Sequence, residues 1–270
     1  MKRPALILGL ILALPAPTSA EWVRAEAEYK FPPIMSEEDA CRRAEERARA
    51  DAIRQVTGEV LSSEETMRCS EQGDVAECSR NSTIWTSVGG EIRSYRNHQS
   101  QTSVVVDDIR KCLISFEADV HVAEGKPDPN FDIDVKLNNA VYRDGENLTV
   151  TLKPSQAMSV QIFQWLPYEK GDAQVGRIFP NQFDTAERIA KSVTIPTEAG
   201  AKRYDLKVGF PASQPGRKMV DEYLMVVATR KPMALRESYA LDDFNRVITE
   251  IPLGDRRIVH RAYNILRGGE

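Results

Sequence analysis

The feature that most restricts the fold of this chain is a series of short apolar runs between residues 131 and 232, each ended by a turn signal. Asp144-Gly145 separates two of these runs and is a strong hairpin signal. In the following run, apolar residues alternate with polar ones: Leu148, Val150 and Leu152 against Asn147, Thr149 and Thr151. Many short strands joined by turns predict an all-β sandwich over residues 131–232.

The preceding region, residues 21–123, has a pattern that predicts an α+β domain. A Ser N-cap at Ser36 and acidic residues after it indicate a helix that starts near Glu37. It is expected to reach Val56 and to stop at Gly58. Strands are expected before and after it, at Trp22–Phe31, Glu91–Asn97, Gln101–Asp107 and, most clearly, Arg110–Val122. We therefore expect one long helix packed on an antiparallel sheet.

The two faces of this helix have different compositions. Small side chains recur at every fourth position, which lets the helix lie close to a sheet: Ala40, Ala44, Ala48 and Ala52. The opposite face is rich in Arg and Glu at i,i+4 spacing, which favours a solvated surface. Partner binding by that face is the alternative interpretation.

All four cysteines lie in the first region. An even number in an exported chain favours disulfides, and three pairings are open. We prefer Cys69 with Cys78, across a hairpin turn, and Cys41 with Cys112, joining the helix to the last strand. The absence of a C-x-x-C motif or a nearby pair of histidines argues against a metal site and a thioredoxin-type redox site.

The first 20 residues have the three parts of a secretory signal peptide. Lys2 and Arg3 precede an apolar run at Ala5–Leu14, and small residues end at a predicted cleavage site after Ala20. The run is half the length that a membrane-spanning helix needs. We expect a periplasmic or secreted, soluble product with no membrane span after cleavage.

The charge balance argues against nucleic acid as a partner. The whole chain has 36 basic and 40 acidic residues. Without the leader, which carries two basic residues and no acidic one, the formal net charge becomes −6. A nucleic-acid-binding protein needs a basic surface to contact phosphates.

Two further segments complete the predicted organisation. Residues 124–130 contain Gly125, Pro127 and Pro129 among charged residues, which is typical of a semi-rigid linker. Residues 233–270 contain apolar residues at helical spacing from Leu241 to Ile251, followed by a last strand. The expected role of this short C-terminal helix is to cover one end of the sandwich, with partner binding as the alternative.

The sequence contains no recognisable catalytic motif. Its three histidines stand far apart, and no H-E-x-x-H, G-x-S-x-G, P-loop or dinucleotide fingerprint occurs. We assign no catalytic, cofactor-binding or metal-binding residue and expect no cofactor. An enzymatic function would require a pair of catalytic carboxylates that only folding brings together.

The run Phe179-Pro180-Asn181 is the one candidate for partner binding within the sandwich. The favoured interpretation is structural, with Phe179 closing the core, Pro180 fixing the exit of the strand and Asn181 bonding its own backbone. An exposed Phe179 that docks a partner is the alternative.

The second region resembles the family called domain of unknown function 4384. The resemblance is carried by an ordered set of matches: Tyr142-Arg143-Asp144-Gly145-Glu146-x-Leu148, Ile178-Phe179-Pro180-Asn181, Ile189-Ala190, Ile195-Pro196, Glu222-Tyr223 and Val227-Ala228-Thr229. It implies a β-sandwich accessory domain of bacterial envelope and signalling proteins, with no assigned chemistry. One feature departs from the family pattern. The family usually has a glycine shortly before the late glutamate, whereas here five residues separate Gly216 from Glu222.

The first region resembles, less specifically, the N-terminal domain of flagellar assembly protein T. A first strand led by Trp22 and the pattern A-x-x-R-A-x-x-x-A at Ala40–Ala48 carry this resemblance. It implies a similar fold and a place in the cell envelope.

These observations predict an exported, non-catalytic cell-envelope protein that binds a protein partner or assists assembly. A periplasmic hydrolase-like enzyme with a site between the two domains is one alternative. A flagellar or outer-membrane secretion accessory is another.

Overall fold

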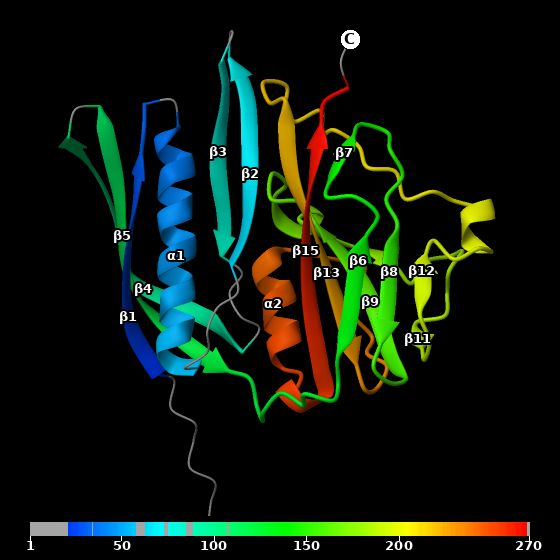
Figure 1. Ribbon diagram of the computed structural model, residues 1–270. Helices are drawn as coiled ribbons and strands as arrows, with labels where there is room; N and C mark the ends of the chain where they lie inside the picture. The colour runs from blue at the N-terminus through cyan, green and yellow to red at the C-terminus, as the bar shows by residue number, and fades with distance from the viewer. Residues whose placement is uncertain are drawn as a thin grey trace, which may run out of the picture.

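The computed structural model describes residues 21–33, 35–57, 63–72, 75–84, 89–106 and 108–268, with 63–72 and 75–84 described by their backbone. The predicted signal peptide at residues 1–20 lies outside this part of the chain. The structure is rich in β-strands and contains two α-helices (Figure 1). Within the described ranges, no helix is long and apolar enough to cross a membrane.

The first half consists of a helix on a three-stranded antiparallel sheet. The strand order is β1 (Glu21–Phe31), β5 (Ile109–Val122), β4 (Gly90–Val106), and α1 (Glu37–Thr57) packs on one face (Figure 1). The backbone N–H of Asp39 donates to the Ser36 hydroxyl at 3.1 Å, which caps the start of α1 as the sequence predicts. The predicted long helix packed on an antiparallel sheet is therefore confirmed.

The alanine stripe of α1 faces this sheet. Ala40, Ala44, Ala48 and Ala52 are all fully buried, and they share a core with the inward side chains of β5. Alanine side chains bury little apolar surface, so additional links between helix and sheet contribute to the stability of this half.

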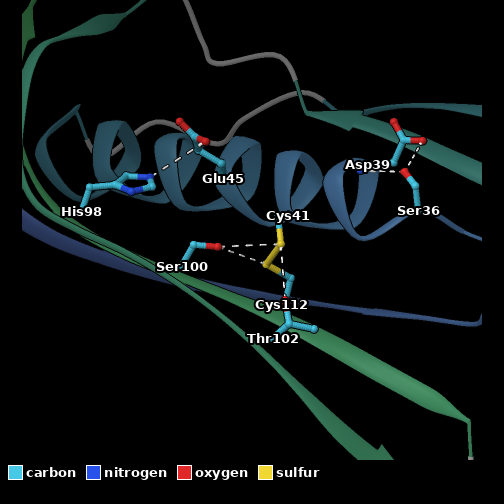
Figure 2. Close-up of a disulfide and its surroundings, with 8 residues drawn as sticks. All are labelled: Ser36, Asp39, Cys41, Glu45, His98, Ser100, Thr102 and Cys112. Carbon is cyan, nitrogen blue, oxygen red and sulfur yellow. Dashed lines mark hydrogen bonds and ion pairs between the residues drawn. A yellow bond between two sulfur atoms is a disulfide. The ribbon is translucent and has the colours of Figure 1, made fainter.

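One such link is a disulfide between Cys41 of α1 and Cys112 of β5, as the sequence predicts (Figure 2). The two Cα atoms are 5.2 Å apart and the residues are separated by 71 positions in the chain. The hydroxyl of Ser100 lies 3.8 Å from the Cys41 sulfur and 3.7 Å from the Cys112 sulfur. The bond joins the helix covalently to the central strand of the sheet.

A separate two-stranded hairpin is formed by β2 (Ser63–Gln72) and β3 (Val75–Ile84). Its antiparallel register places Cys69 directly opposite Cys78. The side chains of this hairpin lie outside the described part of the structure, so the second disulfide stays a prediction.

The register makes the second disulfide testable by peptide mapping. We expect non-reducing digestion and mass spectrometry of the oxidised protein to find Cys69 linked to Cys78 and Cys41 linked to Cys112. Opposed positions on antiparallel strands have Cα separations that suit a disulfide, which is the physical reason. A free thiol at Cys69 or Cys78 in the oxidised protein would contradict the prediction.

The second half contains two sheets. The larger has seven strands, in the order β14-β10-β9-β13-β15-β7 with β11 paired to β9, and the smaller has the order β12-β8-β6. The bounds are β6 Ile133–Leu137, β7 Val141–Arg143, β8 Val150–Pro154, β9 Met158–Trp165, β10 Val175–Phe179, β11 Arg188–Ile189, β12 Val193–Ile195, β13 Met219–Thr229, β14 Ser238–Tyr239 and β15 Arg256–Leu266.

Two apolar cores hold this half together. The first combines side chains of both sheets, including Val150 and Leu152 of β8 with Ile162 of β9 and Leu224 of β13. The second lies against the other side of the large sheet, where α2 (Leu241–Thr249) contributes Phe244 and Ile248. The large sheet is therefore covered by apolar contacts on both faces.

The C-terminal region is part of this architecture. β15 lies between β13 and β7, antiparallel to β13 over its whole length and parallel to β7. The helix predicted from Leu241 to Ile251 is present as α2 and ends at Thr249. Residues 233–270 thus supply an inner strand of the sheet as well as a helix that covers it.

Candidate functional site

A groove separates α1 from the second half of the chain. It consists of two adjoining hollows of about 300 and about 390 Å³, which share Arg42, Glu46, Trp165 and Pro167 in their walls. We call it the interdomain groove; its two walls are α1 and the large sheet with the segments next to it. Figure 1 shows α1 on the side of its own sheet that faces the second half.

The polar face of α1 forms one wall. Arg42, Glu45, Glu46 and Arg49 follow the i, i+3, i+4, i+7 spacing of one helical face, opposite the alanine stripe. The sequence favoured a solvated surface for these residues. In the structure the same face looks onto the groove.

Aromatic side chains form the opposite wall. Trp165 at the end of β9 and Tyr223 of β13 have ring centroids 4.8 Å apart. Trp165 is 8% exposed and Tyr223 is 1% exposed, so both rings are packed in the core and present only a small surface to the groove. The groove has further apolar lining residues: Pro167, Leu241 and, on α1, Ile53.

Ion pairs line the groove. The Arg42 guanidinium lies 2.8 Å from Glu46 and 3.3 Å from Asp39. Burial alone would lower the pKa of Arg42, but the carboxylates of Glu46 and Asp39 raise it. Opposing effects act on Asp39, where burial is outweighed by the Ser36 hydroxyl and by Arg42, and the pKa is lowered. Arg42 and Asp39 are therefore both charged at neutral pH.

His260 of β15 also faces the groove. Burial, and then the nearby Arg261, lower the pKa of His260 to about 4. The ring is therefore neutral at pH 7, and it supplies hydrogen-bonding capacity without a charge.

Several ion pairs join the two halves across the edges of the groove. Arg49 of α1 meets Asp242 of α2 at 2.6 Å, Arg93 of β4 meets Glu250 at 2.8 Å, and Arg217 meets Asp39 at 3.8 Å. Contacts of this kind are weakened by salt, and polar interfaces between domains commonly allow relative motion.

A double-mutant cycle tests the ion pair between Arg49 and Asp242. Arg49→Ala and Asp242→Ala are expected to show a coupling of about 0.5 kcal/mol in the free energy of unfolding at low salt, because exposed ion pairs contribute about that much. The cycle removes the separate effect of Asp242 on the first turn of α2. We expect the coupling to shrink at high salt, and no coupling at low salt would contradict the contact.

A buried carboxylate lies behind the groove. Glu222 of β13 is 2% exposed and accepts hydrogen bonds from Tyr168, from Tyr263 at 2.6 Å and from the Gln164 amide at 2.7 Å. Burial raises the pKa of Glu222, and the three donors oppose that rise. Tyr168 also lines the groove, so it connects this cluster to the site.

The run Phe179-Pro180-Asn181 is placed elsewhere and does not line the groove. Phe179 is 1% exposed and belongs to the core between the sheets, so its ring offers no docking surface. The Asn181 side-chain oxygen accepts from the backbone N–H groups of Phe183 and Asp184, both at 2.9 Å. The contacts of Phe179 and Asn181 are those of a strand end and its turn.

The cysteines and histidines form no metal site in the part of the chain that the structure describes. No group of three or more His, Cys, Asp or Glu side chains there is arranged to hold a metal ion. Cys41 and Cys112 are joined beneath α1, away from the groove. His98 lies 4.0 Å from Glu45 (Figure 2).

Comparisons with known proteins add no assignment. A scan against protein-family models found no match, and a search of curated proteins also found none. The argument for function therefore rests on the interdomain groove and the groups around it.

Proposed function

We propose that this chain is an exported, non-catalytic accessory protein of the bacterial cell envelope, and that it binds a protein partner in the interdomain groove. The observation that carries the proposal is the groove itself, in which the charged face of α1 lies opposite a surface that includes Trp165 and Pro167. Interfaces between proteins commonly combine apolar and aromatic groups at the centre with polar groups around them.

The charged groups favour binding over catalysis. General acid–base catalysis works best with a pKa near the operating pH. In the groove, burial lowers the pKa of His260 to about 4. The hydrolase alternative has a groove of suitable size, but this histidine is not tuned for proton transfer at pH 7.

The envelope assignment rests on the leader pattern and the disulfide. A Cys41–Cys112 disulfide is compatible with an oxidising compartment. The resemblance to domain of unknown function 4384 supports an accessory role, and we extend it to the fold by proposing that the two sheets of the second half form a sandwich of that type. The resemblance to flagellar assembly protein T supports a narrower version of the proposal, in which the protein assists assembly of a surface structure.

In-cell photo-crosslinking tests the proposal. A photoreactive residue at Asn245, which lines the groove, is expected to give a discrete protein adduct in living cells. Lys136 of β6, which does not line the groove, is the exposed control. Adducts from both positions alike, or none from Asn245, would refute a partner site in the groove, and a flagellar or secretion component in the adduct would establish the narrower version.

A further inference from the structure

We propose that the interdomain groove recognises a cationic segment of its partner, in which Lys or Arg side chains alternate with apolar ones. The inference rests on the proposed function, because it names the chemistry of the partner for the same site. It follows from the charge of the groove walls, from the apolar surface opposite α1 and from the continuity of the two hollows.

The charge of the walls is negative. Glu91 pairs with Arg93 and Arg246, which lie outside the groove lining, so it is left out of the balance. Asp221 is 4% exposed and accepts a hydrogen bond from Asn264, so it is also left out. The remaining carboxylates number five: Glu38, Asp39, Glu45, Glu46 and Asp242. The basic groups number four: Arg42, Arg49, Lys170 and Arg217. The lining therefore carries a surplus of one negative charge, and His260 adds none at neutral pH.

The ion pairs place that surplus on the helix wall. Arg42 is engaged by Glu46, and Arg49 is engaged by Asp242. Glu45 lies between the two arginines on the same helical face, with 39% of its side chain exposed. His98 of β4 lies 4.0 Å from this carboxylate, and a cation entering the groove can approach it without breaking either arginine pair.

The apolar surface opposite α1 suits the aliphatic stem of a basic side chain. Lys and Arg bury their aliphatic stems against apolar surfaces while the charged end stays near polar groups. Trp165, Pro167 and Leu241 supply such a surface, and Glu45 and Glu46 stand opposite on α1. The groove thus offers both an apolar contact and a carboxylate to one side chain.

The two hollows form one continuous depression, since they share Arg42, Glu46, Trp165 and Pro167. A segment of several residues can occupy both hollows at once. Each has a volume at the lower end of the range typical of ligand sites. The net charge of the exported chain is also negative, which speeds the approach of a cationic partner.

Fluorescence anisotropy with labelled peptides tests the inference on the full exported chain with its disulfide intact. The probes are a short peptide of alternating Lys and Leu and an otherwise identical peptide of alternating Glu and Leu. We expect the Lys peptide to bind at least about tenfold more tightly at low salt, with affinity falling as salt rises. Equal binding of both peptides would overturn the inference.

A matched pair of variants locates the binding. Glu45→Lys is expected to weaken binding of the Lys peptide about tenfold, because it reverses a charge inside the groove. Glu26→Lys makes the same change in overall charge on β1, where the side chain is 51% exposed and outside the groove, and should leave affinity within about twofold. Equal losses in both variants would show non-specific attraction and overturn the inference.

The two proposals fail separately. A protein adduct from Asn245 in cells, combined with no preference for the Lys peptide, would leave the binding function standing and remove the cationic partner. Loss of the adduct in cells would remove the binding function itself.

Discussion

Replacing both Cys41 and Cys112 with Ala is expected to lower the free energy of unfolding by about 4 kcal/mol, because the disulfide closes a long loop in the unfolded chain. The two residues are 71 positions apart, and Cys112 is fully buried in the core of the first half. The alanine stripe of α1 makes a close but small apolar contact with the sheet. We expect the first half to unfold at a lower denaturant concentration than the second half in this variant.

Urea titration followed by circular dichroism and tryptophan fluorescence measures the effect. Reductant should destabilise the parent protein by more than the double substitution does, because it also opens the predicted Cys69–Cys78 bond, and it should cost the Cys41→Ala/Cys112→Ala variant about 2 kcal/mol. Cys69→Ala/Cys78→Ala serves as the matched control, since a disulfide there would close a much shorter loop and contribute about 2 kcal/mol less. A loss of less than about 1 kcal/mol of unfolding free energy on removal of Cys41 and Cys112 would contradict the expected contribution of this disulfide.

The first half shows which signals in the sequence were sufficient. Ser36 at the start of α1 and the alanine repeat fixed the helix and its buried face, because capping and helical periodicity act over a few residues. The alternation along β5 put Cys112 on the inward face. A helix cysteine and an inward strand cysteine then made Cys41–Cys112 the preferred pair, and this pairing is confirmed.

Local polarity misled the prediction at β4. The sequence suggested separate strands at Glu91–Asn97 and Gln101–Asp107, but one strand runs from Gly90 to Val106. Asn97 adopts a positive φ of 56°, and the pairing with β5 shifts register between Arg96 and Gln99. A bulge of this kind lets a polar stretch continue a strand, and short-range patterns do not distinguish it from a turn.

The groove depends on contacts between distant parts of the chain. The charged face of α1 carries i,i+4 pairs that any solvated helix could have. Only its placement opposite Trp165 and Tyr223 makes it the wall of a site. The position of β15 between β13 and β7 is equally non-local, since β7 lies more than a hundred residues earlier in the chain.

Glu222, behind the groove, also left a readable signal in the sequence. It falls on the same strand face as Val220, Leu224 and Val226, which are buried in the core between the sheets. A carboxylate at an inward position needs hydrogen-bond donors. The donors themselves come from elsewhere in the chain, 54, 41 and 58 residues away at Tyr168, Tyr263 and Gln164, so the sequence could not identify them.

Glu222→Leu is expected to cost about 3 kcal/mol of unfolding free energy, because it leaves two phenols and an amide without their shared acceptor in a buried site. Glu222→Gln is the matched control, since it keeps the volume and one acceptor oxygen and should cost clearly less. Urea titrations of both variants and the parent at pH 7 measure the difference. Equal losses would show that the hydrogen bonds to this carboxylate contribute nothing specific.

The pH dependence of the same variants separates the carboxyl group from its packing. Burial raises the pKa of Glu222 above its ordinary value of 4.5, so the folded protein binds this proton more tightly than the unfolded chain does. The parent therefore loses stability relative to Glu222→Gln as pH rises from below 4.5 through the raised pKa, and the difference levels off above it. Other carboxyl groups are common to both proteins and cancel in the comparison. Parallel stability curves across this range would mean that Glu222 titrates alike in the folded and unfolded states, contrary to its burial behind Tyr168.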